Sequence, residues 1–331
     1  MSTGFADLHD ELRSVARDLL ASGAEWPRMA DAGWLGLEVP EALDGAGATF
    51  AEVAVVLEEL GRAVASSAYF GTAVLGVAAL HDDEVLRDVA SGRSRVAVAV
   101  SAAGDDATFA PPFRVEGGKL SGRATFVADA AEADVLLLLA DDRGETVVVP
   151  VLPDVVHITS EPVLDATRRF ATVVVDEVAV GPGVPVDGQA LLDRAAVAVA
   201  CDSLGLAHAM LDATVAYAKV RTQFDQPIGA FQAVKHQCAD VLVQLTIGRE
   251  LLTLAVEATV AGSADAATAA SRVKSYLGQA AVEAVGTAMQ LHGGIGYTWE
   301  GGVHVYLKRA VLNRSWFGSP AAHRRRLAAT F

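Results

Sequence analysis

Apolar residues recur at helical spacing through the first 92 residues of the chain. Leu8, Leu12, Val15 and Leu19 repeat every three or four positions, and a long apolar run covers residues 50–68. This spacing places apolar side chains on one face of an α-helix. We therefore expect an N-terminal helical domain, interrupted by a loop in which Gly, Pro and Asp-Gly break the pattern.

The pattern changes to short valine-rich segments between residues 93 and 187. Each segment is bounded by Asp-Asp, Gly-Gly or Pro, and β-branched residues in short runs favour strands. We expect a middle domain of antiparallel strands closing into a small barrel, with strands within residues 96–100, 113–122, 134–140, 146–152 and 170–180.

Long helical patterns return from residue 188 onward. They cover residues 191–220, 231–261 and 264–291, and a shorter element follows residue 301. Four such segments joined by short connections predict a C-terminal four-helix bundle. The helix–strand alternation of a Rossmann fold and the GxGxxG motif do not occur in the sequence. The expected fold class is α+β, with domains over residues 1–92, 93–187 and 188–331.

Charge and cysteine content limit the possible functions. A net charge of −15 across 331 residues argues against nucleic-acid binding, because little of the chain would neutralise a phosphate backbone. Arg324, Arg325 and Arg326 form a local exception, for which a solvated helix end and a phosphate or acidic partner are the alternatives. Cys201 and Cys238 lack metal-ligand spacing, so we expect no metal and a reducing compartment.

The sequence also predicts where the protein resides. The N-terminal segment is acidic and amphipathic, unlike a secretory signal. No uninterrupted apolar window approaches the roughly 18 residues that a membrane-spanning helix requires. We therefore expect a cytoplasmic protein without a membrane segment.

The stretch RTQFDQPIGAFQ at residues 221–232 carries more chemistry than a connector between helices needs. Arg221 is a forked, permanent cation that suits a pyrophosphate, and a surface ion pair is the alternative for this residue alone. Gln223 offers amide hydrogen bonds, and Phe224 offers a flat surface for a ring system. Together they indicate a ligand that carries phosphate.

A second motif, QLHGGIGYTWE, begins at Gln290. Gly293 and Gly294 lack a Cβ, so the backbone there can approach a ligand closely. Gln290 lies about one helical turn earlier and can direct its amide to the same place. A helix C-cap is the alternative for the two glycines alone. The two motifs together favour binding of a ligand.

These motifs resemble the patterns RxQFGxPIxxFQ and QxxGGxGYxxE of the acyl-CoA dehydrogenase family. The segment GWLGLEVPEALDGAG and the region from Leu120 to Asp134 are also similar to that family. The resemblance implies its fold, and it implies that these motifs hold the ADP half of an FAD seated mainly on a neighbouring subunit. The residues given this role are Arg221, Gln223, Phe224, Phe231, Gln290, Gly293 and Gly294.

One residue of the first motif departs from the family pattern. Asp225 stands where the family usually has glycine. A carboxylate near a pyrophosphate is repulsive unless it points away or pairs with a cation. The role of Asp225 is therefore left open.

The catalytic base of the family has no counterpart in this chain. The family uses a glutamate to remove the α-proton of the thioester, and such a base must lie within hydrogen-bond reach of that proton. Counting nine residues from Arg309 places Gly318 at the usual position, and the position used by a minority of members holds Ala195. Asp193 and Asp202 lie out of register. No catalytic residue is therefore assigned to this chain.

The flavin-side residues of the family pattern are also replaced. Ala128 stands where a threonine hydroxyl bonds the flavin, Ala124 replaces a lysine, and residues 101–109 replace the segment TEPxxGSD. The resemblance therefore points to the base-lacking subunit of an actinobacterial heterotetrameric (α2β2) acyl-CoA dehydrogenase of the sterol side-chain type. It implies a partner subunit with the glutamate, FAD shared across the interface, an acyl-CoA substrate and electron-transfer flavoprotein as acceptor. A silent acyl-CoA-binding or scaffold protein and a homomeric flavin-dependent oxygenase are the alternatives.

Overall fold

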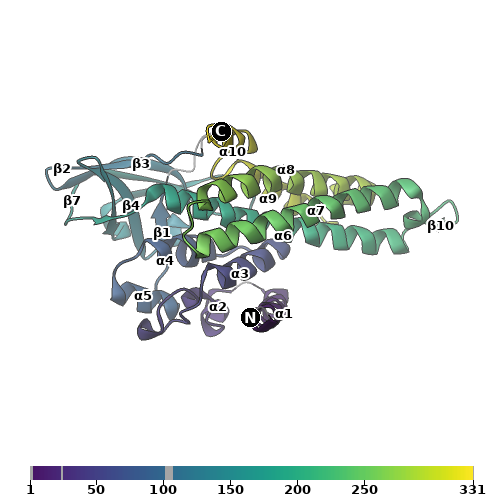
Figure 1. Cartoon of the computed structure of the whole chain (residues 1–331), viewed down its shortest axis with the longest axis horizontal. Helices are drawn as coiled ribbons and strands as arrows, with labels where there is room; N and C mark the ends of the chain where they lie inside the picture. Colours follow the sequence, from purple (N-terminus) through teal and green to yellow (C-terminus); the bar gives the residue numbers. More distant parts are fainter. Residues whose placement is uncertain (1–2, 24, 101–106, 331) are drawn as a thin grey trace.

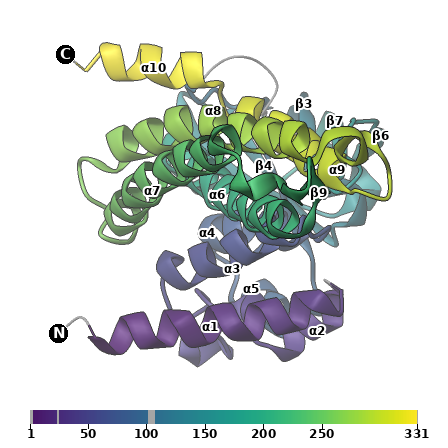
Figure 2. The same cartoon turned by 90° about the vertical axis from the view of Figure 1, so that its right-hand side faces the viewer.

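The computed structural model describes residues 3–23, 25–100 and 107–330. Most of residues 101–109, which replace the TEPxxGSD segment of the family pattern, therefore lie outside the described residues. The N-terminal helices form a layer beneath the bundle (Figure 2). In α3, the side chains of Thr49 and Glu52 form a capping box that fixes where the helix begins. The elements are α1 (Thr3–Ala21), α2 (Trp26–Asp31), η1 (Trp34–Gly36), η2 (Glu41–Leu43), α3 (Phe50–Arg62), the π-helix η3 (Phe70–Gly76), α4 (Val77–Ala79) and α5 (Asp83–Ala90).

The middle region is a sheet with strand order β6-β7-β3-β2-β4-β5-β8, in which β1 also pairs with β4. The strands are β1 (Val96–Ala99), β2 (Phe113–Glu116), β3 (Lys119–Ala128), β4 (Val135–Asp142), β5 (Glu145–Val151), β6 (His157–Glu161), β7 (Phe170–Ala179) and β8 (Val184–Pro185); two 3-10 turns, η4 (Ala130–Glu132) and η5 (Pro153–Val155), lie between them.

The sheet differs from the predicted antiparallel barrel in its pairing. Strands β1 and β2 both run parallel to β4. At least one other strand lies between each of them and β4 in the sequence, so the chain crosses over and no tight hairpin forces an antiparallel pairing. The segment predicted as one strand over 113–122 turns back at Gly117 and Gly118. Among the described strands, no pairing joins β6 to β8, so backbone hydrogen bonds leave the sheet open. The arrangement of helices, sheet and bundle is as predicted.

The C-terminal region is the expected helical bundle, with one additional helix. The bundle helices are α6 (Gly188–Val220), α7 (Gln232–Val260), α8 (Ala266–His292) and α9 (Val303–Ser315), and α10 (Pro320–Ala328) packs against α8. A small hairpin of β9 (Thr222–Gln223) and β10 (Gln226–Pro227), followed by the turn η6 (Ile228–Ala230), joins α6 to α7 and projects from one end of the molecule (Figure 1). None of the helices in the described ranges is long and apolar enough to cross a bilayer.

Helices α3 and α6 approach closely enough for their backbones to touch. A Cβ placed on Gly205 would lie 1.8 Å from the Glu58 carbonyl oxygen, and one placed on Gly61 would lie 2.1 Å from the Asp202 carbonyl oxygen. Glycine is therefore required on both helices. This contact joins the N-terminal layer to the bundle and places Asp202 in the interior.

Candidate functional site

The RTQFDQP segment folds as a tight hairpin at the end of α6. Gln223 pairs with Gln226 across two strands, and Phe224 and Asp225 form the turn between them. Their φ angles are 53° and 62°, as a type I′ turn requires at both central positions. The turn projects both residues away from the body of the chain.

This turn gives a structural reason why Asp225 is accepted there. Aspartate is among the few non-glycine residues enriched in the left-handed region, because its short side chain bonds local backbone groups. Asp225 therefore occupies a backbone conformation that also suits the family's glycine. The backbone conformation of the turn therefore accounts for Asp225 at this position.

The side chains of the hairpin are directed toward solvent. Arg221 and Gln223 are exposed, and Phe224 is 86% exposed. Phe231 is half-buried and meets Phe224 edge to face, with ring centroids 6.1 Å apart. Phe231 thus supports the position of a large aromatic ring that the chain itself leaves uncovered.

The second motif begins in the last turn of α8. Gln290 is exposed, and Gly293 takes a φ of 61° as the helix ends and the 3-10 turn η7 (Gly293–Tyr297) begins. Among the described residues, no atom lies within 4 Å of a Cβ placed on Gly293 or Gly294. The backbone at this helix end is therefore open to another molecule.

A ring contact brings the two motifs to the same end of the bundle. Tyr217, one turn before Arg221, stacks on His292 with ring centroids 4.6 Å apart. The ends of α6 and α8 therefore lie side by side. Six of the seven predicted cofactor-binding residues are exposed there, and Phe231 is half-buried.

A buried charge network lies inside the bundle around Asp202. The Asp202 carboxylate accepts hydrogen bonds from Arg309 Nε at 3.0 Å, Arg168 Nη2 at 2.9 Å and Asn313 Nδ2 at 2.7 Å. Burial favours a higher pKa for Asp202, but the adjacent Arg309 and Arg168 guanidinium groups hold this pKa below its ordinary value. Asp202 is therefore a structural anion that ties α6 to α9 and to the segment before β7.

A cluster of buried aromatic rings lies next to this network. Trp316 packs against Phe70, with centroids 4.5 Å apart, and against Phe170 at 5.1 Å. Phe317 stacks on Trp316 at 4.7 Å, and the Arg168 guanidinium lies over the Trp316 ring at 5.3 Å. The sequence motifs did not predict this cluster. The adjacent aromatic residues Trp316 and Phe317 were the signal for it in the sequence. Sequence spacing alone could not bring Phe70 and Phe170 to it.

Two of the remaining charged residues, Asp193 and Arg326, pair with each other. Asp193, which lies out of register with the family's base, is buried and forms a two-pronged ion pair with Arg326. Of the two alternatives for the three arginines, the solvated helix end is wrong for Arg326, because its side chain on α10 pairs with Asp193 near the start of α6. Burial lowers the pKa of His208 on the same helix.

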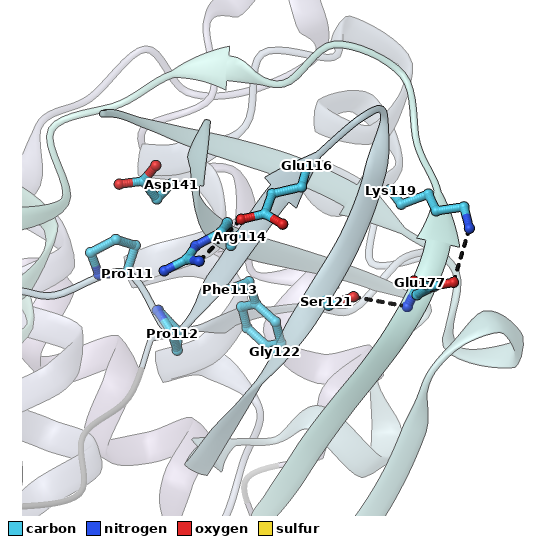
Figure 3. A pocket seen from close by; sticks show the side chains of 10 residues that line it. All are labelled: Pro111, Pro112, Phe113, Arg114, Glu116, Lys119, Ser121, Gly122, Asp141 and Glu177. Atoms are coloured by element: carbon cyan, nitrogen blue, oxygen red, sulfur yellow. Dashed lines mark hydrogen bonds and ion pairs between the residues drawn. The ribbon is translucent and has the colours of Figure 1, made fainter. Parts of the chain in front are cut away.

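The structure also contains a polar cleft on the outer part of the sheet (Figure 3). Its volume is about 590 Å³, and Phe113 and Gly122 are among the residues that line it. Arg114 pairs with Glu116 and Lys119 with Glu177, so these charges already have partners. Strand β2 and the β10 hairpin lie near opposite ends of the molecule, so the cleft is remote from the two motifs (Figure 1).

Two family models match the sequence. Residues 5–82 match the acyl-CoA dehydrogenase N-terminal domain, and residues 181–331 match the acyl-CoA dehydrogenase C-terminal domain. The chain is 33% identical over 298 residues to the acyl-CoA dehydrogenase IpdE2 of Mycolicibacterium smegmatis, covering 88% of this chain and 83% of the relative. The chain belongs to the acyl-CoA dehydrogenase family.

Solved structures of acyl-CoA dehydrogenases share the fold over nearly the whole chain. The Tcur3481–Tcur3483 steroid acyl-CoA dehydrogenase, in a G363A variant, has a TM-score of 0.90 and 28% identity, covering 98% of this chain and 97% of that chain. The ChsE4–ChsE5 complex from Mycobacterium tuberculosis has a TM-score of 0.87 and 23% identity, with 97% and 96% covered. A glutaryl-CoA dehydrogenase from Mycobacterium smegmatis, solved in complex with FADH2, has a TM-score of 0.83 and 17% identity, with 100% and 95% covered.

The structure buries both residues that the sequence pattern aligns with the family's base positions. Gly318 is buried next to Phe317, and Ala195 is buried within α6. Neither residue has an ionisable side chain. The two nearest acids on α6, Asp193 and Asp202, are each paired with arginine. None of these four residues therefore offers an unpaired carboxylate or another basic side chain.

The exposed motif pair is chemically suited to the ADP half of FAD. Arg221 provides a forked cation for a pyrophosphate, and the uncovered backbone at Gly293 and Gly294 allows close approach. The residues that the family pattern places next to the flavin ring offer fewer hydrogen-bonding groups in this chain. Ala128 lacks the hydroxyl of the family pattern, and the adjacent Asp129 carboxyl has its pKa raised to about 6 by burial. The donor set therefore fits a cofactor that approaches from outside the chain.

Proposed function

We propose that this chain is the subunit without a catalytic base in a heteromeric FAD-dependent acyl-CoA dehydrogenase. A homologous partner subunit carries the glutamate, and two copies of each assemble as α2β2. The observation that carries this proposal is the contrast within one chain. The predicted cofactor-binding residues are exposed at the bundle end, apart from the half-buried Phe231, whereas Gly318 and Ala195 stand where the family resemblance places the base.

The contribution of this chain is to bind and orient the ADP half of the partner's FAD. Arg221 pairs with the pyrophosphate, Gln223 and Gln290 supply amide hydrogen bonds, and the backbone at Gly293 and Gly294 lies against the cofactor. Phe224, supported by Phe231, covers a flat part of it. When bound, FAD supplies the hydride-accepting chemistry of an α,β-desaturation.

The surface of α7 supports assembly with another subunit. Leu242, Val243, Ile247 and Leu254 are each about half exposed on this long helix. Exposed apolar side chains gathered on one element mark interaction surfaces more often than scattered ones do. Helix α7 begins directly after the β9–β10 hairpin, so a partner that packs along this helix extends toward the end of the molecule that carries Arg221.

The proposed substrate is the CoA thioester of a bulky acyl group, of the sterol side-chain type. The structural relative with 28% identity is described as a steroid acyl-CoA dehydrogenase, which favours this class. We propose electron-transfer flavoprotein as the acceptor, as the family resemblance implies. In this scheme the acyl group is desaturated in the partner's site, because that subunit holds the base.

Co-expression with a homologous subunit that has a base glutamate tests the proposal. The complex should be yellow and should desaturate the thioester, and the chain alone should do neither. Arg221→Ala should lower the FAD retained per complex after gel filtration, by roughly tenfold or more for loss of one charge-assisted contact. Arg143→Ala is the matched control, since this arginine is 92% exposed on a distant turn of the sheet.

Other outcomes would refute the assignment. A yellow homotetramer of this chain with dehydrogenase activity would show that no base-bearing partner is needed. Acyl-CoA binding by the chain without flavin or partner would favour the scaffold alternative. Oxygen consumption by a flavin-loaded homomer would favour the oxygenase alternative.

A further inference from the structure

The Trp316–Phe317 segment has unfavourable local features that its surroundings must offset. Phe317 has a φ of 57°, a left-handed conformation that bulky residues rarely adopt. Trp316 is buried, yet within the described part of the chain its indole N–H has no hydrogen-bond partner. Buried indole N–H groups usually find one. Tertiary contacts must therefore impose the conformation of this segment.

Lys274 provides one of these contacts from α8. Its ammonium donates to the carbonyl oxygens of Gly318 at 2.8 Å, Asn313 at 2.9 Å and Arg314 at 3.1 Å. These three acceptors use all three N–H donors of a lysine. No carboxylate among the described residues pairs with this buried ammonium, and burial lowers the pKa of Lys274 to about 7. The lysine therefore serves the backbone around residues 313–318.

His323 holds the same segment from α10. Its Nε2 donates to the Phe317 carbonyl oxygen at 2.9 Å, and its Nδ1 accepts from Ser271 Oγ at 3.2 Å. The carbonyl groups of the adjacent residues Phe317 and Gly318 are thus fixed by side chains from two different helices. Removing both side chains would leave the strained segment without its main polar restraints.

We propose that Trp316 and Phe317 form an internal lid over a site the size of one aromatic ring. Lys274 and His323 are the latch that holds this lid shut. When the lid opens, the site binds a planar aromatic anion. Lifting Trp316 uncovers the face of Phe70, the ring of Phe170 and the Arg168 guanidinium, all of which now contact the indole. Aromatic surfaces and a cation suit a flat, negatively charged ligand.

Arg168 has a free donor for such a ligand. Its Nη2 donates to Asp202, but its Nε has no partner among the described residues, although the side chain is buried. An anionic group entering with the ring could accept this hydrogen bond. The inference concerns the interior of this chain and goes beyond the partner-subunit role, because Arg221 and the β9–β10 hairpin take no part in it.

The double variant Lys274→Met/His323→Phe tests the latch in the full-length protein, isolated in its native assembly. Hydrogen exchange by mass spectrometry should show roughly tenfold faster exchange at residues 316–319, with α8 unchanged within about twofold. Anilinonaphthalene sulfonate, whose naphthalene sulfonate part is a flat aromatic anion, should then bind saturably to the variant and not to the wild type. Lys308→Met is the control, because this lysine lies over the Trp299 ring and does not contact the lid.

Each alternative result overturns part of the inference. Unchanged exchange at 316–319 would show that the latch does not hold the lid. Faster exchange throughout α8 would show that the two residues only maintain the fold. An opened lid without saturable dye binding would show that no site lies beneath it.

A second variant tests the site when the double variant does not fold. Trp316→Ala removes the indole while leaving the latch in place. Added indole should raise the melting temperature of this variant and leave that of the wild type unchanged, as ligands do for an apolar cavity of their own shape. An equal response of the two proteins would overturn the ring-sized site.

Discussion

The substitution Asp202→Asn probes the buried charge network most directly. Asp202 is fully buried and accepts hydrogen bonds from two arginines and from Asn313. Arg309 is also fully buried, and it contacts the Ala65 carbonyl oxygen at 2.7 Å. Replacing the carboxylate by an amide keeps the shape of the side chain and leaves both guanidinium groups without their shared counter-charge.

The expected loss of stability follows from this burial. Breaking a buried ion pair by neutralising one partner costs about 3–5 kcal/mol, because the remaining charge stays desolvated. For a chain of 331 residues, the average unfolding entropy per residue converts this loss into a melting-temperature decrease of about 4–7 °C. Thermal unfolding followed by circular dichroism, and urea unfolding at constant pH, measure both quantities.

Asp212→Asn is the matched control on the same helix. Asp212 pairs with Arg62, but its side chain is 60% exposed, so this pair is screened by solvent. Its loss should cost no more than about 1 kcal/mol. If Asp202→Asn were destabilising only to the same small degree, the two arginines would not depend on Asp202. The network would then not be the tie between α6, α9 and the segment before β7.

Three further predictions concern other parts of the chain. Burial lowers the pKa of His323 to about 4, whereas the pKa of a histidine in the unfolded chain is near 6.5. The neutral side chain therefore contributes fully to stability above pH 6.5, and this contribution is lost as the pH falls toward 4. The loss of about 3 kcal/mol should be absent from the unfolding curves of His323→Gln. Gly205→Ala should lower the free energy of unfolding in urea by roughly 1–3 kcal/mol, because the added Cβ meets a backbone carbonyl group. Gly286→Ala, on the exposed face of α8, should instead raise it by about 0.5–1 kcal/mol. Equal effects of the two substitutions would contradict the close contact of α3 and α6. Asp225→Gly should preserve the β9–β10 hairpin. Asp225→Val should raise the rate of hydrogen exchange in the hairpin, because a β-branched residue costs about 1–2 kcal/mol in the left-handed region. Equal exchange rates in the two variants would argue against the type I′ turn.

The candidate site illustrates which features local sequence can reveal. The RTQFDQPIGAFQ motif combines a cation, an amide and aromatic rings within a few residues, so its ligand-binding character could be inferred from composition and order alone. The type I′ geometry at Phe224 and Asp225 could not, because Asp225 replaces the glycine that usually signals such a turn. The stacking of Tyr217 on His292, which brings the two motifs together, joins residues that are far apart in the sequence.

The sequence by itself determined the succession of helices, short strands and helices, because hydrophobic periodicity is a local property that follows from the geometry of each element. It also determined which positions lack an acid, since Gly318 and Ala195 have no ionisable group in any fold. Only the tertiary structure decided that β1 runs parallel to β4, that Asp193 and Arg326 pair, and that Trp316 packs against Phe70 and Phe170. These features depend on contacts between distant segments, and no local pattern specifies which of the many possible distant partners a buried side chain will have.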